Sequence, residues 1–486
     1  MKFKEFEFGY ADAEKEYTRT PEIFQKAFYD SRGIVDKLID GYQCILIGRK
    51  GVGKSAYSAK IQTIANSENE KDLYAFPLQL NDFEFSTFSK TNVGDEVTGT
   101  NKYKASWDFI LLSMIYKILH TNLGITEVDS FSNMLSLLEI LGFPSNVGYK
   151  KDVLRLSKIK MGTDVLKFDV EFEKAFGEKP STYLERISTL NDKMLDVLAD
   201  IWLDKQKIII LIDGMDDILR FKKNKVEILS SLVRSIDYLN NKFIGMKIPV
   251  KAILFIREDI MNTIVDPDMN KIKRDGAIYL GWQNRLDDLR EIVKLRFLLS
   301  GVPTEEVDSC WGKMFPKFIK GKESWNYVLD HTLAKPRDVL QFLKCCQDVY
   351  PDKEGLSYSE VNAVLKEYSK EYFIEEMKNE ITGFVNDSLV VELPAIFQKI
   401  GEKKFTYREF SELVNNQSAG KLEDNDIKYL LLLLFDAGYI GQLYNNGRNK
   451  KMSVIFKYRN TSAKIDYGQM FITHQGLHSG LGIRKH

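Results

Sequence analysis

Eight residues near the start of the chain have the types and the spacing needed to hold a phosphate chain. The segment Gly48-Arg-Lys-Gly-Val-Gly-Lys-Ser55 matches G-x-x-x-x-G-K-[ST] at every position. Glycines let backbone N–H groups converge on phosphate oxygens without steric conflict. A lysine then reaches the β- and γ-phosphates, and a hydroxyl ligates magnesium. The residues expected to bind ATP are Gly48, Arg49, Lys50, Gly51, Val52, Gly53, Lys54, Ser55 and Ala56.

A second group of candidate residues is acidic. An apolar run, 207–213, ends at Asp213, and Asp216 and Asp217 follow closely. A buried strand that ends in a carboxylate places it where ligands bind in open α/β sheets. We expect Asp213 and Ser55 to hold Mg²⁺, and Asp216 or Asp217 to polarise the attacking water. The alternative for either of these two aspartates is a cap on the next helix.

Two arginines complete the expected set of catalytic residues. Arg257 ends another apolar run and would lie next to the γ-phosphate. Arg337, in Ala-Lys-Pro-Arg-Asp, begins a helix and would touch the nucleotide only when the helical region closes over it. An ion pair is the alternative for each, and Arg274 is a candidate finger for a neighbouring subunit. The catalytic candidates are therefore Lys54, Asp213, Asp216, Asp217, Arg257 and Arg337.

The elements that position these residues are strands that alternate with helices. Short apolar runs typical of buried parallel strands occur at 43–48, 73–80, 207–213, 250–257 and 277–282. This alternation predicts an α/β P-loop core with an open parallel sheet. A chain of 486 residues is too long for one ordinary domain. We expect a core at 1–283 with a helical insertion at about 85–205, an all-helical lid at 284–387, and a winged-helix domain at 388–486.

The predicted winged helix rests on local signals. Thr406 and Glu409 form a capping box, and Asn445-Asn-Gly447 is a hairpin turn. The helix at 427–435 is rich in leucine and offers few side chains that could read bases. The basic residues of the wing and tail are Arg448, Lys450, Lys451, Lys457, Arg459, Lys464, Arg484 and Lys485. This region could therefore contact nucleic acid non-specifically, bind a protein partner or be a purely structural tail.

Composition excludes several classes of protein. Lys+Arg and Asp+Glu number 69 each, so the surface is not basic throughout. The four cysteines show no disulfide framework and no metal spacing, which predicts free or buried thiols. His474 and His478 are four residues apart, but Gly476 between them and the lack of a nearby carboxylate argue against a metal site. No apolar run approaches roughly 18 residues, so we expect a cytoplasmic protein without a membrane partner.

Taken in order, these motifs resemble the AAA+/STAND side of the P-loop ATPases, which includes Orc/Cdc6-like and NACHT-like proteins. The sequence is most similar to bacterial ATPases whose loop is GRKGxGKSA, several of which occur in anti-phage defence loci. The resemblance spans about residues 5–350. It implies an ATP-gated, often oligomeric switch with slow hydrolysis, in which Arg257 and Arg337 are sensors. Many relatives have glutamate in the second acidic position, where this chain has Asp216 and Asp217. Because the carboxylate of aspartate reaches less far, we expect ATP binding to be retained and ATP turnover to be weak.

Three functions remain open from the sequence. The first is a regulatory ATPase that controls a separate effector or sensor protein in anti-phage defence. The second is an Orc-like ATPase that loads on or remodels DNA. The third is an enzyme whose own catalytic group lies in the insertion at about 85–205.

Overall fold

In the computed structural model, the chain forms two compact units. The described residues are 1–30, 32–67, 72–81, 83–92, 101–125, 128–146, 148–163, 165–177, 182–201, 206–214, 226–417, 422–446 and 451–483. Unit 1 comprises Met1–Arg32, Arg49–Ala59 and Leu280–His486. Unit 2 comprises Gly33–Gly48 and Lys60–Tyr279. Each unit has its own packed interior.

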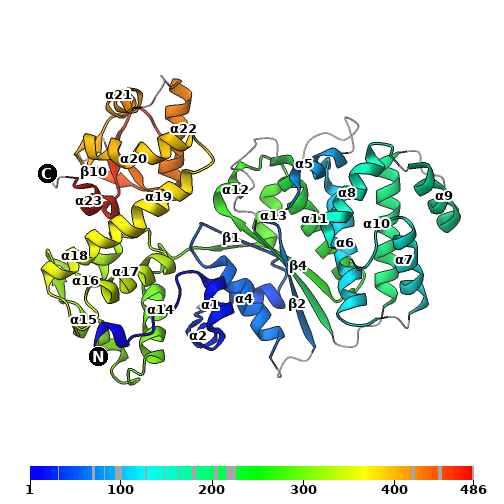
Figure 1. Ribbon diagram of the computed structural model, residues 1–486, viewed down its shortest axis with the longest axis horizontal. Coiled ribbons are helices and arrows are strands. Elements are labelled where there is room, and N and C mark those ends of the chain that lie inside the picture. Colours follow the sequence, from blue (N-terminus) through cyan, green and yellow to red (C-terminus); the bar gives the residue numbers. More distant parts are fainter. Residues whose placement is uncertain are drawn as a thin grey trace. The chain divides into compact units, whose positions relative to one another are not determined.

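Unit 2 is built on a five-stranded sheet with the order β2-β3-β4-β1-β5 (Figure 1). The strands are β1 (Ile45–Gly48), β2 (Leu73–Gln79), β3 (Lys207–Asp213), β4 (Val250–Arg257) and β5 (Ala277–Leu280). The pairings of β1 with β4, β3 with β4 and β2 with β3 are all parallel. The prediction of an α/β core with a parallel sheet is therefore confirmed. Because parallel strands end at one edge, the ends of β1, β3 and β4 lie close together.

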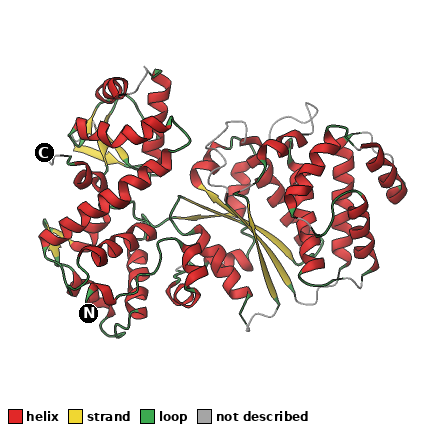
Figure 2. Ribbon diagram, in the orientation of Figure 1, coloured by secondary structure: helices red, strands yellow, loops and turns green. Residues whose placement is uncertain are grey.

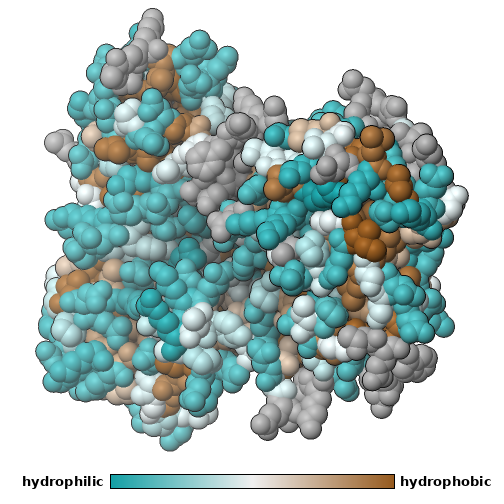
Figure 3. All heavy atoms as spheres, turned by 45° about the vertical axis from the view of Figure 1, so that its right-hand side comes forward, coloured by the Kyte–Doolittle hydropathy of each residue, from teal (hydrophilic) through white to brown (hydrophobic). Residues whose placement is uncertain are grey.

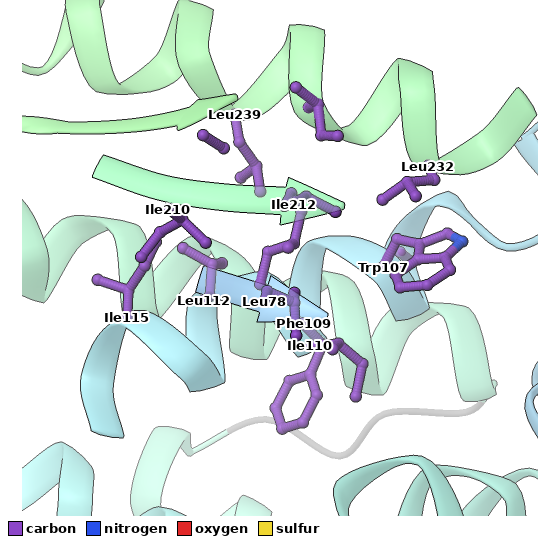
Figure 4. Packing of buried hydrophobic residues seen from close by; sticks show 14 of the residues in the cluster. Leu78, Trp107, Phe109, Ile110, Leu112, Ile115, Ile210, Ile212, Leu232 and Leu239 are labelled. Atoms are coloured by element: carbon purple, nitrogen blue, oxygen red, sulfur yellow. The ribbon is translucent and has the colours of Figure 1, made fainter. Parts of the chain in front are cut away.

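The sheet is buried because its central strands are apolar on both faces. Every residue of β4 is buried, and β3 is buried from Ile208 onward. Helices α6 (Lys104–Thr121) and α11 (Val226–Gly245) pack against each other, and α11 packs on β4. Figure 4 shows side chains of β3 and α6 in one apolar cluster with α11. The indole N–H of Trp107 is satisfied by the Ile228 carbonyl at 3.0 Å.

The insertion between β2 and β3 is helical over its described residues (Figure 2). Besides α6, it contains α5 (Phe85–Phe88), α7 (Asp129–Ile140), α8 (Tyr149–Lys160), α9 (Val165–Phe176) and α10 (Tyr183–Asp200). The remaining helices of the unit are α3 (Ile34–Ile39), α12 (Glu258–Thr263) and α13 (Met269–Gly276). Figure 3 shows a face that is mostly hydrophilic, with hydrophobic atoms gathered toward its right-hand side.

The helical part of unit 1 combines the start of the chain with the residues after β5. Its helices are α1 (Ala13–Arg19), α2 (Pro21–Ala27), α14 (Leu286–Leu299), α15 (Val307–Met314), α16 (Ser324–Leu329), α17 (Pro336–Val349), α18 (Tyr358–Tyr368) and α19 (Ile374–Ile381). The N-terminal aromatics pack on this bundle, with Phe6 on Phe297 and Phe3 on Phe315. This packing explains why the first 32 residues group with a region far along the chain.

One prediction for this region is wrong. We expected helices alone between about 285 and 385, but β6 (Phe318–Ile319) and β7 (Lys322–Glu323) form a short hairpin. Its two turn residues, Lys320 and Gly321, have φ values of 50° and 78°. Positive φ at both central positions defines the type I′ turn that joins antiparallel strands tightly. The pair Lys320-Gly321 only weakly predicts such a turn from sequence, since asparagine or aspartate is more common at its first central position.

The C-terminal part of unit 1 is a mixed helix and sheet segment. In chain order it contains α20 (Asp387–Ile400), β8 (Lys404–Phe405), α21 (Tyr407–Gln417), α22 (Asp424–Ala437), β9 (Ile440–Asn446), β10 (Lys451–Ile455), β11 (Met470–Thr473) and α23 (Gln475–Leu481). The sheet order is β10-β9-β11-β8, with antiparallel pairs. The capping box is confirmed, because Thr406 and Glu409 exchange backbone-to-side-chain hydrogen bonds.

Two further sequence features have clear structural outcomes. All four cysteines are free and buried, as predicted. None of the helices formed by the described residues has both the length and the apolar run that crossing a bilayer requires.

A buried ion pair joins the N-terminal segment to α14, and it generates a test of unit 1. Arg296 donates to both carboxylate oxygens of Glu16 at 2.6 and 2.8 Å, and both side chains are about 5% exposed or less. Glu16→Gln would leave a buried guanidinium without its counter-charge and should destabilise unit 1 by about 3 kcal/mol. Thermal unfolding measures this as a lower midpoint. The exposed control Glu22→Gln should change little, and an unchanged midpoint for Glu16→Gln would contradict the expectation.

Candidate functional site

The predicted phosphate loop lies between β1 and helix α4 (Lys54–Ala65). Gly51 and Gly53 have φ values of 78° and 101°, in the region that disfavours residues with a Cβ. The loop residues therefore follow a backbone path that depends on glycine at two of the three expected positions. Lys54 is the first residue of α4, and Ser55 follows it, so both are in the first turn of a helix whose N-terminal N–H groups attract anions.

Asp213 lies at the carboxyl end of β3, where the sequence predicts it. It is 7% exposed, and its Oδ1 accepts a hydrogen bond from the Gly214 N–H at 2.7 Å. Gly214 has a φ of 85°, and a Cβ there would lie 2.6 Å from Asn81 Oδ1. Gln79 pairs with Asp213 across the two strands. Sequence reasoning missed Gln79 and Asn81, because polar residues after a strand are common in ordinary loops.

Arg257 ends β4 directly beside the residue that begins the phosphate loop. In the parallel register, Gly48 of β1 pairs with Arg257. The guanidinium is 6% exposed and donates to both oxygens of Asp259 at 2.9 and 2.7 Å. Arg274 is different, since its side chain is exposed and pairs with the adjacent Asp275. Asp216 and Asp217 lie outside the described residues.

Within unit 1, Arg49 and Lys50, two loop positions that the motif leaves open, contact residues far along the chain. Arg49 donates through Nη2 to the carbonyl of Ala437, at the end of α22. Its guanidinium also lies 5.4 Å from the ring centroid of Tyr458, in cation–π geometry. Lys50 pairs with Glu376 of α19 at 3.7 Å. Positions that the motif leaves open are thus used to join the loop to its surroundings.

Two more contacts fix the loop from other directions. The indole N–H of Trp282 donates to the carbonyl of Val52 at 2.9 Å. Lys54 Nζ donates to the carbonyl of Arg49 at 3.3 Å. The first contact orients a peptide group of the loop, and the second keeps the lysine over the loop that it belongs to.

The start of helix α17 faces the same loop. A Cβ built on Gly51 would lie 3.4 Å from Lys335 Cδ and 3.6 Å from Arg337 Cδ. Arg337, the predicted sensor, therefore lies against the loop within unit 1, and its Nε donates to the Ala11 carbonyl at 3.2 Å. Lys335 was not predicted. Its sequence signal was only a cation before a proline that begins a helix.

Several cations lie on the loop or beside it, and acids also lie near Lys335. The cations are Arg49, Lys50, Lys54, Lys335 and Arg337, and all belong to unit 1. Burial, and next the charge of Arg49, lower the pKa of Lys335 to about 8. A group of phosphates would relieve this repulsion, which is the electrostatic requirement of an anion site.

The donors predicted for magnesium suit that ion. Ser55 offers a hydroxyl and Asp213 a carboxylate, and Mg²⁺ prefers oxygen ligands with few protein groups. The described residues contain no cluster of three His, Cys, Asp or Glu side chains that would make an all-protein metal cage. Each of the two donor types is therefore one that Mg²⁺ accepts together with phosphate oxygens.

Two buried acids of the helical insertion, Asp108 and Asp152, and the half-buried Asp169 have partners within the protein. Asp108 accepts from Lys104 and Ser235, and Asp169 pairs with Arg186 through two hydrogen bonds. Asp152 accepts from Ser113 and Lys117. These carboxylates stabilise helix contacts, so the described part of the insertion offers little support for a second catalytic centre.

Basic and histidine side chains near the C-terminus also have structural partners. Lys457 donates to the carbonyl of Ala463, and Arg459 pairs with Asp330 and donates to the Tyr458 hydroxyl. His474 caps α23 by accepting from the Gly476 N–H. Burial lowers the pKa of His474 well below its usual value, so this imidazole is neutral. Arg448, Lys450, Arg484 and Lys485 lie outside the described residues.

Comparison with known proteins finds a family match in one region of unit 1. Residues 287–375, from α14 to the start of α19, match the FunZ-associated C-terminal helical domain. This segment includes the start of α17, with Lys335 and Arg337, but covers under half of the chain.

Two further likenesses extend over longer parts of the chain. The chain is 21% identical over 329 residues to the putative transposon gamma-delta 80.3 kDa protein of Escherichia coli (strain K12). That alignment covers 66% of this chain and 44% of the relative, so the chain spans under half the relative's length. The crystal structure of Cdc6p from Pyrobaculum aerophilum aligns with a TM-score of 0.32 and 10% identity. It covers 95% of this chain and 96% of the other.

The contacts of Arg49 predict that the loop stabilises the end of α22. Arg49→Met would remove the hydrogen bond to the Ala437 carbonyl and the contact with Tyr458, a loss of about 1–2 kcal/mol. Amide hydrogen exchange at the end of α22 should become about 10-fold faster. Arg408→Met is the matched control, because Arg408 is exposed and pairs only with Glu412 among the described residues. Equal exchange in both variants would show that the contact carries no stability.

Proposed function

We propose that this chain binds ATP with Mg²⁺ and hydrolyses it slowly, as a molecular switch of the AAA+/STAND type. The observation that carries the proposal is the loop Gly48–Ser55, in which two glycines with positive φ connect a buried parallel strand to a helix. Backbone N–H groups and a helix N-terminus at such a turn bind phosphate without further requirements. The cations gathered on the loop within unit 1 support the same conclusion.

Within this proposal the residues have distinct roles. Lys54 would bind the β- and γ-phosphates, while Ser55 and Asp213 would hold the magnesium ion. The ion, when bound, supplies positive charge to the phosphate oxygens. Asp216 or Asp217 would orient the attacking water. Arg257 and Arg337 would respond to the γ-phosphate, and oligomerisation could add Arg274 of a neighbouring copy.

The proposed biological role is regulation of a separate effector or sensor protein in bacterial anti-phage defence. It rests on the resemblance of the motifs to bacterial ATPases with a GRKGxGKSA loop. We further propose the domain layout of a core at 1–283, a helical lid at 284–387 and a winged helix at 388–486. The contacts of Arg49 and Lys50 with α22 and α19 support communication between the loop and the C-terminal region.

A second candidate is an Orc-like ATPase that loads on or remodels DNA. The observation in its favour is the order α20, β8, α21 and α22 followed by the hairpin of β9 and β10, which is typical of a winged helix. Against it, α22 buries one apolar face that includes Leu430, Leu431 and Leu434, and Lys457 and Arg459 are used in contacts with the protein itself. We therefore favour the regulatory switch.

Nucleotide binding and turnover by the purified protein test both candidates. We expect wild-type protein to bind ATP and hydrolyse it slowly, at a rate that double-stranded DNA does not change. Lys54→Ala and Asp213→Ala should each reduce hydrolysis by about 100-fold or more, because charge stabilisation at the phosphates is lost. Stimulation by DNA that both substitutions abolish would instead favour the DNA-acting candidate. Absence of ATP binding by wild-type protein would contradict the proposed function.

A further inference from the structure

Lys335 is a buried cation without a partner among the residues that the structure describes. Its side chain is 5% exposed, and its Nζ makes neither a hydrogen bond nor an ion pair there. Asp338, three residues later, accepts instead from the Leu333 N–H at 2.8 Å and the Tyr372 hydroxyl at 2.9 Å. Burying most of a lysine side chain without a partner for its ammonium group carries a desolvation cost. A site that retains such a group is arranged for a ligand of opposite charge.

The acids near Lys335 do not replace that ligand. Asp338, Glu380 and Glu376 favour its charged form, but none pairs with it, and Glu376 pairs with Lys50 at 3.7 Å. Arg49 opposes the charge from the loop side. The balance of these groups leaves Lys335 with a lowered pKa of about 8.

The side chain of Lys335 packs against the loop at Gly51. Its Cδ lies 3.4 Å from the position that a Cβ on Gly51 would occupy. It is the N-cap residue of α17, a helix of 14 residues, so the N–H groups of the first turn lie next to the same place. Ala334, just before it, has a φ of 51°, and strain of this kind at a non-glycine residue is concentrated at functional sites.

We infer that Lys335 is a second phosphate-binding lysine, whose Nζ contacts the phosphate chain of the nucleotide held by the loop Gly48–Ser55. The inference rests on the proposed nucleotide binding and adds to it a residue at the start of α17. The phosphates supply the counter-charge that the described protein groups do not. Bound nucleotide therefore ties the start of α17 to the loop through an ion pair that forms only in the complex.

Substitution of Lys335 tests this role by equilibrium binding of Mg·ATP and ADP to the full chain. Lys335→Met should weaken binding by about 10-fold or more, as expected for loss of a charge-assisted contact. Lys335→Arg should retain most of the affinity. The control Lys344→Met changes a lysine on the same helix whose Nζ lies over the Tyr10 ring, and it should bind as wild type does. Thermal unfolding without nucleotide should show an equal or higher midpoint for Lys335→Met, since a buried charge is removed.

The dependence on pH provides a readout that a purely structural lysine would not move. A bound anion raises the pKa of the Lys335 ammonium group. At a pH where this lysine is partly deprotonated in the free protein, nucleotide binding is therefore accompanied by uptake of a proton. Wild-type affinity should therefore fall as pH rises through about 8, where Lys335 titrates without ligand. That fall should be smaller in Lys335→Met than in Lys344→Met.

The possible failures are distinguishable. If wild-type protein binds ATP, Lys54→Ala does not, and Lys335→Met binds as tightly as wild type, the inference is overturned while the proposed function stands. The same conclusion follows if Lys335→Met lowers the unfolding midpoint and leaves nucleotide affinity unchanged, because Lys335 would then stabilise the fold through the charges of the neighbouring acids. If wild-type protein binds no nucleotide, the proposed function and the inference both fail.

Discussion

A loop that offers bare backbone N–H groups to an anion cannot stabilise itself. Gly51 and Gly53 adopt positive φ and contribute no side chain to packing, so the loop must be held by groups outside it. Trp282 binds the Val52 carbonyl, while Arg49 binds the end of α22. These contacts with other parts of unit 1 restrict the motion of a loop whose glycines would otherwise make it flexible.

The same arrangement creates an electrostatic constraint. The chain has no net charge, yet several cations converge on one loop. Lys50 pairs with Glu376 and Arg49 donates to a carbonyl, whereas Lys335, buried beside Gly51, makes neither kind of contact with the residues that the structure describes. A bound anion would offset the charge of these cations. In the proposed complex, nucleotide binding and the packing of unit 1 would therefore be coupled through Coulomb energy.

Much of the fold follows from short-range patterns. The runs 207–213 and 250–257 coincide with β3 and β4 because a strand buried on both faces requires continuous apolar sequence. The capping box at Thr406 and the glycine after α22 mark helix ends by their own hydrogen bonds and dihedral angles. The hairpin of β6 and β7 escaped prediction because its strands have two residues each, too few for any periodic signal.

The sequence by itself determined the glycine loop at residues 48–55, the strand that leads into it and the acid at the end of β3, since each depends on residues adjacent in the chain. Tertiary structure alone decided what surrounds the loop. Arg49 and Ala437, or Gly51 and Lys335, are hundreds of residues apart, and their contact depends on the packing of the N-terminal segment, α17 and the C-terminal sheet. Long-range pairing of this kind leaves no local pattern, because one lysine before a proline has the same sequence whether it faces water or a buried loop.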